Sequence, residues 1–173
     1  YVAVDEEVLG LIALMDIPSE HAKATIEYFR KQGIHTTLIT GDSEMTGKAV
    51  AKQLGIDEVI ANVMPEDKSR IIDEQKEKYG VTAMVGDGVN DAPALVNADV
   101  GIAMGDGTDV AVEVSDLVLM QNNLSKLVQS HNISSKMNRV IWQNIIFSMA
   151  VVAFLIVVSF LGLTDIAISV IIH

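Results

Sequence analysis

The sequence contains no cysteine among its 173 residues, so neither a disulfide framework nor a thiolate metal site can form within it. This absence agrees with a reducing compartment. Basic residues are also scarce, since 12 Lys and Arg stand against 23 Asp and Glu, a net charge of −11. A nucleic-acid partner requires clustered Lys and Arg to neutralise backbone phosphates. The acidic balance therefore argues against nucleic acid as a partner.

Formal charge is almost missing from the C-terminal part of the chain, where only Asp165 carries one after Arg139. Residues 145–163 are uncharged and mostly Leu, Ile, Val or Phe. At about 1.5 Å per residue they span roughly 28 Å, close to the hydrocarbon thickness of a bilayer. We expect an integral membrane protein with a transmembrane helix here, and the alternative is a buried core helix.

The charges that flank this segment predict its orientation. Lys126, Lys136 and Arg139 precede it, whereas only Asp165 follows. The positive-inside rule then places the preceding soluble part in the cytoplasm, at the cell membrane. A second membrane segment is expected to begin near residue 166. Because the chain begins at Tyr1 and ends within that apolar run, we expect it to be part of a longer protein.

The remainder alternates between strand and helix patterns and predicts an α/β fold. Residues 1–4 and 8–15 are expected to form strands, followed by a helix at 19–32. Further strands are expected at 34–39, 58–61, 81–85, 100–104 and 117–120, and helices at 43–54, 65–78, 92–97 and 108–114. Such alternation predicts a Rossmann-like parallel sheet with helices on both faces, here followed by the transmembrane helix. Ligand sites in these sheets lie at the carboxyl ends of the strands.

One run at such a strand end, Met-Val-Gly-Asp-Gly-Val-Asn-Asp-Ala-Pro-Ala-Leu at 84–95, predicts a magnesium and phosphate site. Gly86 and Gly88 let the backbone approach an anion without the steric cost of a Cβ at unusual dihedrals. Carboxylate oxygens suit Mg²⁺, so Asp87 and Asp91 are the predicted metal ligands. Asp87, Asn90 and Asp91 would share one face if a helix begins inside the turn.

Two further elements fit a phosphate site. Thr40-Gly41-Asp42 follows the strand at 34–39 and precedes a helix, where free N–H groups and the helix dipole favour an anion. The Thr40 hydroxyl could donate to a phosphoryl oxygen, or the segment could be a simple helix cap. Lys68 could neutralise charge on a transferring phosphoryl group, or it could be an ordinary exposed lysine.

The run at 84–95 resembles the hinge motif of the P-type cation-transporting ATPases. Residues 40, 68 and 87 also follow the order of the threonine, lysine and aspartate motifs of the wider haloacid-dehalogenase-like superfamily. The resemblance implies an ATP-driven pump with an aspartyl-phosphate intermediate and with Mg²⁺ and ATP as cofactors. It implies that Lys68 and Thr40 stabilise the phosphoryl group and that Asn90 fixes the turn. The implied catalytic residues are Thr40, Gly41, Asp42, Lys68 and Asn90, with Gly86 and Gly88 binding the cofactor.

The phosphorylated aspartate of that family, in an Asp-Lys-Thr-Gly-Thr motif, is absent from the sequence. Asp5 follows a strand-like segment but lacks the lysine and threonine, so we interpret it as a turn residue. The nucleotide and actuator domains are missing as well, and we expect the chain alone not to hydrolyse ATP. The expected organisation is a partial phosphorylation domain at 1–122, a cytosolic linker helix at 123–139, a transmembrane helix at 140–163 and the start of the next at 164–173.

The resemblance is to the heavy-metal subgroup, which implies a divalent heavy-metal cation and the lipid bilayer as partners. Residues 165–173 are similar to the start of the last helix in zinc, cobalt or iron exporters, where a His-Glu pair supplies ligands, so His173 is a candidate ligand of the transported ion. Copper exporters carry Tyr-Asn where this chain has Gln143-Asn144, which favours the Zn/Cd/Co/Fe class. Two alternatives remain, a membrane-anchored phosphatase of the same superfamily and an inactive regulatory module that binds magnesium or phosphate.

Overall fold

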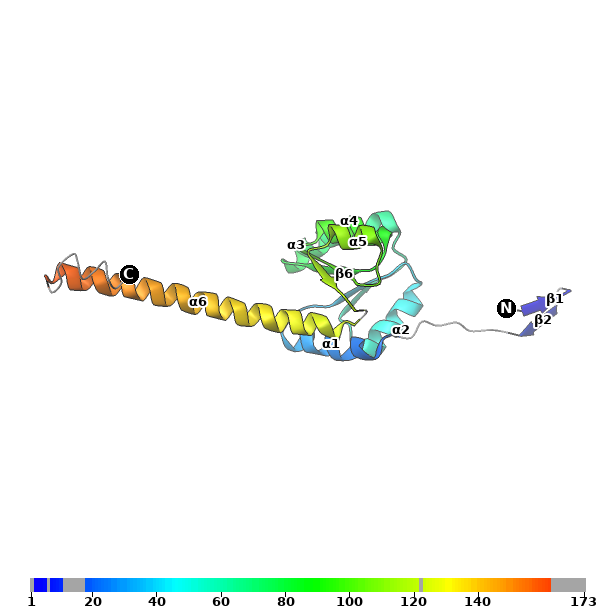
Figure 1. Ribbon diagram of the computed structural model, residues 1–173. Helices are drawn as coiled ribbons and strands as arrows, with labels where there is room; N and C mark the ends of the chain where they lie inside the picture. Colours follow the sequence, from blue (N-terminus) through cyan, green and yellow to red (C-terminus); the bar gives the residue numbers. More distant parts are fainter. Residues whose placement is uncertain (1, 6, 11–17, 122, 163–173) are drawn as a thin grey trace. The chain divides into compact units, whose positions relative to one another are not determined.

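The computed structural model describes residues 2–5, 7–10, 18–121 and 123–162 (Figure 1). The chain divides into two compact units, one ending at Val128 and the other beginning at Gln129. The first unit contains every strand and all helices except most of the last one. The fold of that unit positions the candidate site.

The strands form three small sheets. An antiparallel pair joins β1 (Val2–Val4) to β2 (Glu7–Gly10), and a parallel pair joins β3 (Thr37–Ile39) to β4 (Glu58–Ile60). A second parallel sheet has the order β5 (Ala83–Gly86), β6 (Val100–Met104), β7 (Leu117–Leu119). Asp5 lies in the turn between β1 and β2 with a positive φ of 47°, which confirms it as a turn residue. The rest of the second predicted strand, residues 11–15, lies outside the described residues.

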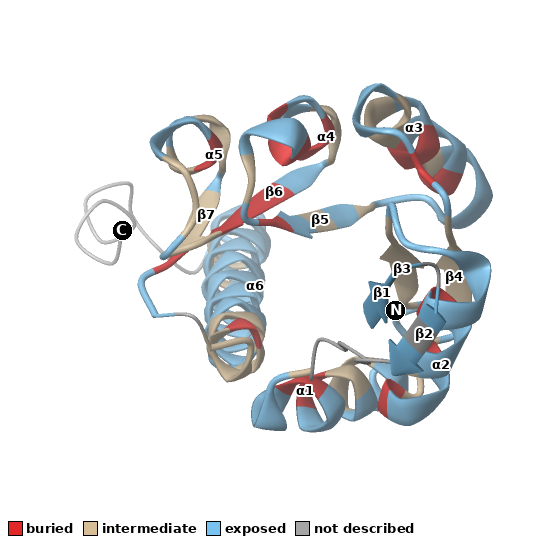
Figure 2. Cartoon of the chain, turned by 90° about the vertical axis from the view of Figure 1, so that its right-hand side faces the viewer, coloured by how far each residue is buried: buried red, intermediate tan, exposed pale blue. Residues whose placement is uncertain are grey.

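Helices cover both faces of the parallel strands (Figures 1 and 2). The helices are α1 (Glu20–Lys31), α2 (Glu44–Leu54), η1 (Pro65–Asp67) leading into α3 (Lys68–Tyr79), η2 (Val89–Asp91) leading into α4 (Ala92–Asn97), α5 (Asp109–Val114) and α6 (Ser125–Phe160). Helices α3, α4 and α5 lie on one side, and α1 and α2 lie on the other. The predicted α/β fold with helices on both faces is therefore confirmed.

Alternation along β6 shows how the two faces are filled. Ala103 is fully buried in a cluster with Leu95 of α4 and Ala111 of α5. Its neighbour Ile102 belongs to a different cluster, with Leu119 and with Leu127 at the start of α6. Successive side chains of a strand point to opposite faces, so β6 is covered by helices on both sides.

Local capping chemistry sets the ends of α2. The Ser43 hydroxyl accepts a hydrogen bond from the Thr46 N–H at 3.2 Å, so Ser43 rather than Thr40 is the N-cap. Gly55 ends the helix with φ 78°, a left-handed conformation that glycine adopts without the cost of a Cβ. Gly33 follows α1 with φ 76°, whereas Ser19, which precedes the helix, makes no side-chain cap hydrogen bond.

The parallel strands form two sheets where the strand pattern predicts one. Among the described strands, β3 pairs only with β4, and β5 pairs only with β6. One edge of β3 and one edge of β5 are therefore without a strand partner in the described part of the chain.

Helix α6 is one continuous element of 36 residues. It contains neither glycine nor proline, so nothing in its sequence interrupts the helix. At about 1.5 Å per residue it extends roughly 54 Å, well beyond the thickness of a bilayer core. Its most apolar window has a mean hydropathy of 2.3 and is not buried by any described part of the chain, so it is not a core helix of these residues. Residues 163–173, with His173 and the predicted second membrane segment, lie outside the described residues.

Candidate functional site

The turn after β5 is closed around the side chain of Asp91. This residue is 7% exposed, and its Oδ2 atom accepts hydrogen bonds from the backbone N–H groups of Asp87 and Gly88, both at 3.3 Å. The turn is the 3-10 helix η2, so an α-helix does not begin within it as the spacing of Asp87, Asn90 and Asp91 suggested. Asp91 therefore points back into the turn that precedes it.

The structure shows a steric role for Gly86, whereas the approach of Gly86 and Gly88 to an anion stays a prediction. Neither Gly86 nor Gly88 has a positive φ. A Cβ at Gly86 would lie 2.7 Å from the Cβ of Asp91, which is too close for any side chain. Gly86 thus leaves room for Asp91, and the expected unusual dihedrals are not found.

Lys68 and Asp91, 23 residues apart in the sequence, form an ion pair. The Lys68 Nζ atom donates to Asp91 Oδ1 at 2.6 Å, and the two side chains are only 19% and 10% exposed. Lys68 is the first residue of α3, and its pairing with Asp91 ties this helix to the turn. Both carboxylate oxygens of Asp91 are therefore occupied, one by Lys68 and one by the turn amides.

Asp87 differs from Asp91 in that its carboxylate is available. The residue is exposed, and its carboxylate makes no hydrogen bond or ion pair with any described residue, while its N–H is held by Asp91. Asn90 is exposed too, and its side chain also makes no hydrogen bond within the described ranges. The turn amides are bound by Asp91, and the expectation that Asn90 fixes the turn stays a prediction.

The segment Thr40-Gly41-Asp42 lies at the carboxyl end of β3. The Thr40 hydroxyl donates to Asp42 Oδ2 and accepts from the Asp42 N–H, both at 3.1 Å. The Thr40 carbonyl also accepts from the Val63 N–H at 3.1 Å, just before η1 and Lys68. This segment is thus joined to the chain that leads to Lys68, but none of its hydrogen bonds reaches the Asp87 turn within the described residues.

The donor set fits magnesium as far as this chain provides it. No group of three or more His, Asp or Glu that could hold a metal ion occurs among the described residues. Mg²⁺ is usually bound through one or two carboxylates together with water and phosphate oxygens. The exposed, unpaired carboxylate of Asp87 matches this requirement, whereas a protein-only metal cage is not present in the described part.

A neighbouring loop contacts this turn and was not predicted. Gly105-Asp106-Gly107 follows the end of β6, and the next residue, Thr108, donates its backbone N–H to the carbonyl oxygen of Asp87 at 3.0 Å. The signal in the sequence is a second Gly-Asp-Gly, placed after a strand in the same way as Gly86-Asp87-Gly88.

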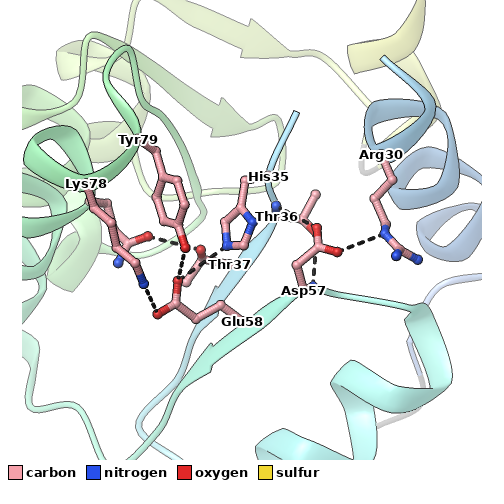
Figure 3. Close-up of polar contacts among 9 residues, drawn as sticks. Arg30, His35, Thr36, Thr37, Asp57, Glu58, Lys78 and Tyr79 are labelled. Carbon is pink, nitrogen blue, oxygen red and sulfur yellow. Dashed lines mark hydrogen bonds and ion pairs between the residues drawn. The ribbon is translucent and has the colours of Figure 1, made fainter. Parts of the chain in front are cut away.

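A separate polar cluster lies at the other end of β3 and β4 (Figure 3). Glu58 accepts hydrogen bonds from Lys78 Nζ at 2.8 Å and from the Tyr79 hydroxyl at 3.0 Å, and it lies 3.3 Å from His35 Nε2. The Lys78 ammonium, together with Tyr79 and His35, lowers the pKa of Glu58. His35 also stacks on Tyr79 with ring centroids 4.1 Å apart.

Next to it, Asp57 accepts from the Thr36 hydroxyl at 2.7 Å and from the Thr36 N–H at 3.0 Å, and it pairs with Arg30 at 2.9 Å. The Thr36 hydroxyl is the main cause of the lowered pKa of Asp57. An open hollow of about 290 Å³ borders this cluster, lined by Arg30, Gly33, Ile34, His35 and Asp57. It lies at the amino end of β3, whereas Thr40 follows the carboxyl end. We therefore interpret the cluster as structural.

Comparisons with known proteins show which proteins this chain resembles. The chain is 49% identical over all 173 residues to a zinc-transporting ATPase of Bacillus subtilis (strain 168), of which it covers 27%. It is 44% identical over 147 residues, 85% of the chain, to a copper-exporting P-type ATPase of Staphylococcus haemolyticus (strain JCSC1435), of which it covers 18%. The chain thus spans between 18% and 27% of the length of these relatives.

Among solved structures, a zinc-transporting PIB-type ATPase in the E2.Pi state superposes with a TM-score of 0.88 at 37% identity, over 96% of this chain and 27% of that one. These similarities confirm the resemblance to heavy-metal P-type ATPases. The family model of haloacid dehalogenase-like hydrolases matches residues 1–99. The chain therefore belongs to the haloacid dehalogenase-like hydrolase family.

Proposed function

We propose that this chain is part of a P-type ATPase that exports a divalent heavy-metal cation by way of an aspartyl-phosphate intermediate. The observation that carries the proposal is a difference in environment between two carboxylates. Asp91 is buried and paired with Lys68, whereas Asp87 is exposed and unpaired. One aspartate is thereby committed to structure and the other is available to a cation.

In the proposed whole protein, an aspartate outside this chain accepts the γ-phosphate of ATP, which splits one difficult phosphoryl transfer into two easier steps. Asp87 would hold Mg²⁺, which when bound neutralises charge on phosphate oxygens. Asp91 orients Lys68 through the 2.6 Å ion pair, and Lys68 supplies positive charge to the phosphoryl group. Thr40 could donate its hydroxyl to the same group by giving up its bond to Asp42. The chain alone lacks the accepting aspartate and is expected to be inactive.

Helix α6 is proposed to carry the membrane-bound part. Its apolar window is long enough to cross a bilayer, and Lys126, Lys136 and Arg139 lie on the amino-terminal side of that window. By the positive-inside rule the unit at residues 1–128 would lie in the cytoplasm. The transported ion would then pass beside the part of α6 that follows Arg139.

We propose a divalent ion of the zinc class rather than copper. The similarity to the zinc-transporting ATPase extends over the whole chain, whereas that to the copper exporter covers 85% of it. The Gln143-Asn144 pair also departs from the Tyr-Asn pattern of copper exporters. His173 remains a proposed ligand of the transported ion.

The proposal is tested by phosphoenzyme formation in the full-length protein. Radiolabelled ATP should give an acid-stable, hydroxylamine-sensitive phosphoprotein whose amount depends on Zn²⁺ more than on Cu⁺. Asp87→Asn should abolish most of it because the variant removes the anionic oxygen that binds Mg²⁺. Asp106→Asn is the matched control, since Asp106 is exposed and occupies the same place in the second Gly-Asp-Gly. This control should keep the phosphoenzyme.

Other outcomes would identify the alternatives. Equal phosphoenzyme levels in Asp87→Asn and the unaltered protein would contradict the assignment of Asp87 as the Mg²⁺ ligand. Release of phosphate from phosphate esters without dependence on a transported metal would indicate a membrane-anchored phosphatase. Mg²⁺ binding without phosphoenzyme or phosphate release would indicate a regulatory module. Stimulation by Cu⁺ alone would move the protein to the copper class.

A further inference from the structure

The loop between β6 and α5 closes tightly on the Asp87 turn. The Gly107 N–H donates to the Met104 carbonyl at 2.8 Å, and the Thr108 N–H donates to the Asp87 carbonyl at 3.0 Å. The Thr108 hydroxyl in turn accepts from the Ala111 N–H and caps α5. The loop is thus anchored to a helix on one side and to the candidate site on the other.

Gly107 occupies a position that admits no side chain. A Cβ there would lie 2.7 Å from the Met104 oxygen and 2.8 Å from the Asp87 oxygen. Its φ is not in the left-handed region, so space rather than backbone conformation requires glycine. Because both obstacles are backbone atoms, a side chain at 107 would displace the loop or the Asp87 carbonyl.

Both polar backbone atoms of Asp87 are therefore fixed. Its N–H is held by the Asp91 carboxylate and its carbonyl by the Thr108 N–H. The Asp87 carboxylate itself is exposed and has no partner among the described residues. These two contacts fix the backbone of Asp87 and therefore the direction of the Cα–Cβ bond from which its carboxylate extends.

We propose that the loop Gly105–Thr108 is a positioning element of the cation site, acting through the Thr108 amide and the absence of a side chain at Gly107. This inference rests on the proposed function, in which Asp87 binds Mg²⁺. Groups that orient a metal ligand typically change metal affinity by about 10- to 100-fold when they are removed. The loop should therefore affect cation affinity without contacting the cation.

The test replaces Thr108 in two ways in the full-length protein. Thr108 has φ −69°, which suits proline. Thr108→Pro removes the N–H and places a ring carbon against the Asp87 oxygen, so that this carbonyl must move. Thr108→Ala keeps the N–H and loses only the capping hydroxyl. Gly107→Ala and Gly101→Ala form a second matched pair, because a Cβ at Gly101 would lie 2.6 Å from the Leu95 carbonyl oxygen but would meet neither Asp87 nor the loop.

The readout is the affinity for Mn²⁺, a spectroscopic substitute for Mg²⁺, measured by electron paramagnetic resonance, with thermal unfolding recorded in parallel. We expect Thr108→Pro and Gly107→Ala to weaken Mn²⁺ binding by roughly 10-fold or more. Thr108→Ala and Gly101→Ala should lower the unfolding temperature yet keep the Mn²⁺ affinity within about 2-fold, since neither perturbs the Asp87 carbonyl. If Thr108→Pro does not fold, the comparison between the two glycine variants tests the positioning role of the loop.

The variant Asp87→Asn distinguishes a failure of the proposed cation site from a failure of the proposed positioning role of the loop. If Asp87→Asn leaves Mn²⁺ affinity unchanged, the proposed cation site itself is wrong. If Asp87→Asn weakens binding while Gly107→Ala binds Mn²⁺ as well as Gly101→Ala does, the positioning role of the loop is overturned and the cation site stands.

Discussion

The pairing of Lys68 with Asp91 should be worth far more than an ion pair on the surface. The two side chains are mostly buried, and removing one partner leaves the charge of the other buried without a counter-charge. Lys68→Met should lower the free energy of unfolding by about 3 kcal/mol, the low end of the range for breaking a buried pair. Urea unfolding of the chain in detergent, followed by circular dichroism, measures this loss.

The control for this prediction is Lys48→Met. Lys48 pairs with Glu44 one helical turn away, at 2.6 Å, but both side chains are about two-thirds exposed. Such an exposed pair contributes little to stability, because solvent screens its attraction and holding the two side chains together costs entropy. Equal losses in the two variants would contradict the argument, because burial would then have no effect on the strength of the pair.

Glu58 should make the stability of the fold depend on pH. Its pKa lies below the ordinary value of 4.5, chiefly because Lys78 donates to it. The unfolded chain therefore binds a proton more readily than the folded one, and the stabilisation is complete above about pH 4.5 and is lost as the pH falls through the lower folded pKa. Glu58→Gln should flatten this acid limb of the unfolding free energy. An unchanged acid limb in the variant would exclude Glu58 as a source.

At the scale of single elements, α6 makes the membrane proposal testable. An arginine at the centre of a transmembrane helix costs about 2.5 to 3.5 kcal/mol of insertion free energy. Val152→Arg, in the middle of the uncharged segment, should strongly reduce insertion in a translocon assay with engineered glycosylation sites. Asn132→Arg, in the same helix but before Arg139, should insert normally. Equal insertion of the two variants would contradict a span centred near Val152.

Element boundaries could be predicted where a local side chain or glycine sets them. Ser43 and Gly55 mark the ends of α2 in the sequence, and the structure places them as caps. The start of β3 could not be found in this way. A strand was predicted from residue 34, but the Thr36 N–H binds the Asp57 carboxylate, so the strand begins only at Thr37. That partner lies 21 residues away and leaves no local signal.

The candidate site was predictable to a similar extent. The spacing of Asp87 and Asp91 marked the turn, but nothing local indicated that Asp91 would be buried against Lys68 while Asp87 stayed exposed. The contact of Thr108 with Asp87 joins the ends of two neighbouring strands, so it depends on the order β5-β6. Sequence patterns predict the strands but not the order in which they pair. The second Gly-Asp-Gly was the one sequence feature that could have indicated the contact between Thr108 and Asp87.

At the scale of the whole molecule, the separation of β3-β4 from β5-β6-β7 calls for a physical explanation. Both sheets are parallel, and parallel sheets normally occur buried, with few exposed edges. An unpaired edge leaves backbone N–H and C=O groups without strand partners and is a site for pairing with another strand. The relatives are several times longer than this chain. We expect a further strand to pair with the free edges of β3 and β5 in the longer protein.

Hydrogen exchange can test this pairing strand by strand. In the chain alone, amides on the free edges of Thr37–Ile39 and Ala83–Gly86 should exchange rapidly, because no strand protects them. In the full-length protein the same amides should become protected, since a neighbouring strand would then accept their hydrogen bonds. The strand Val100–Met104 is paired on both sides within the chain and serves as the internal control. Its amides should be protected in both proteins, so rapid exchange throughout the chain would indicate general unfolding. Rates at β3 and β5 that stay equal in the two proteins, with β6 protected in both, would mean that no strand joins the two sheets.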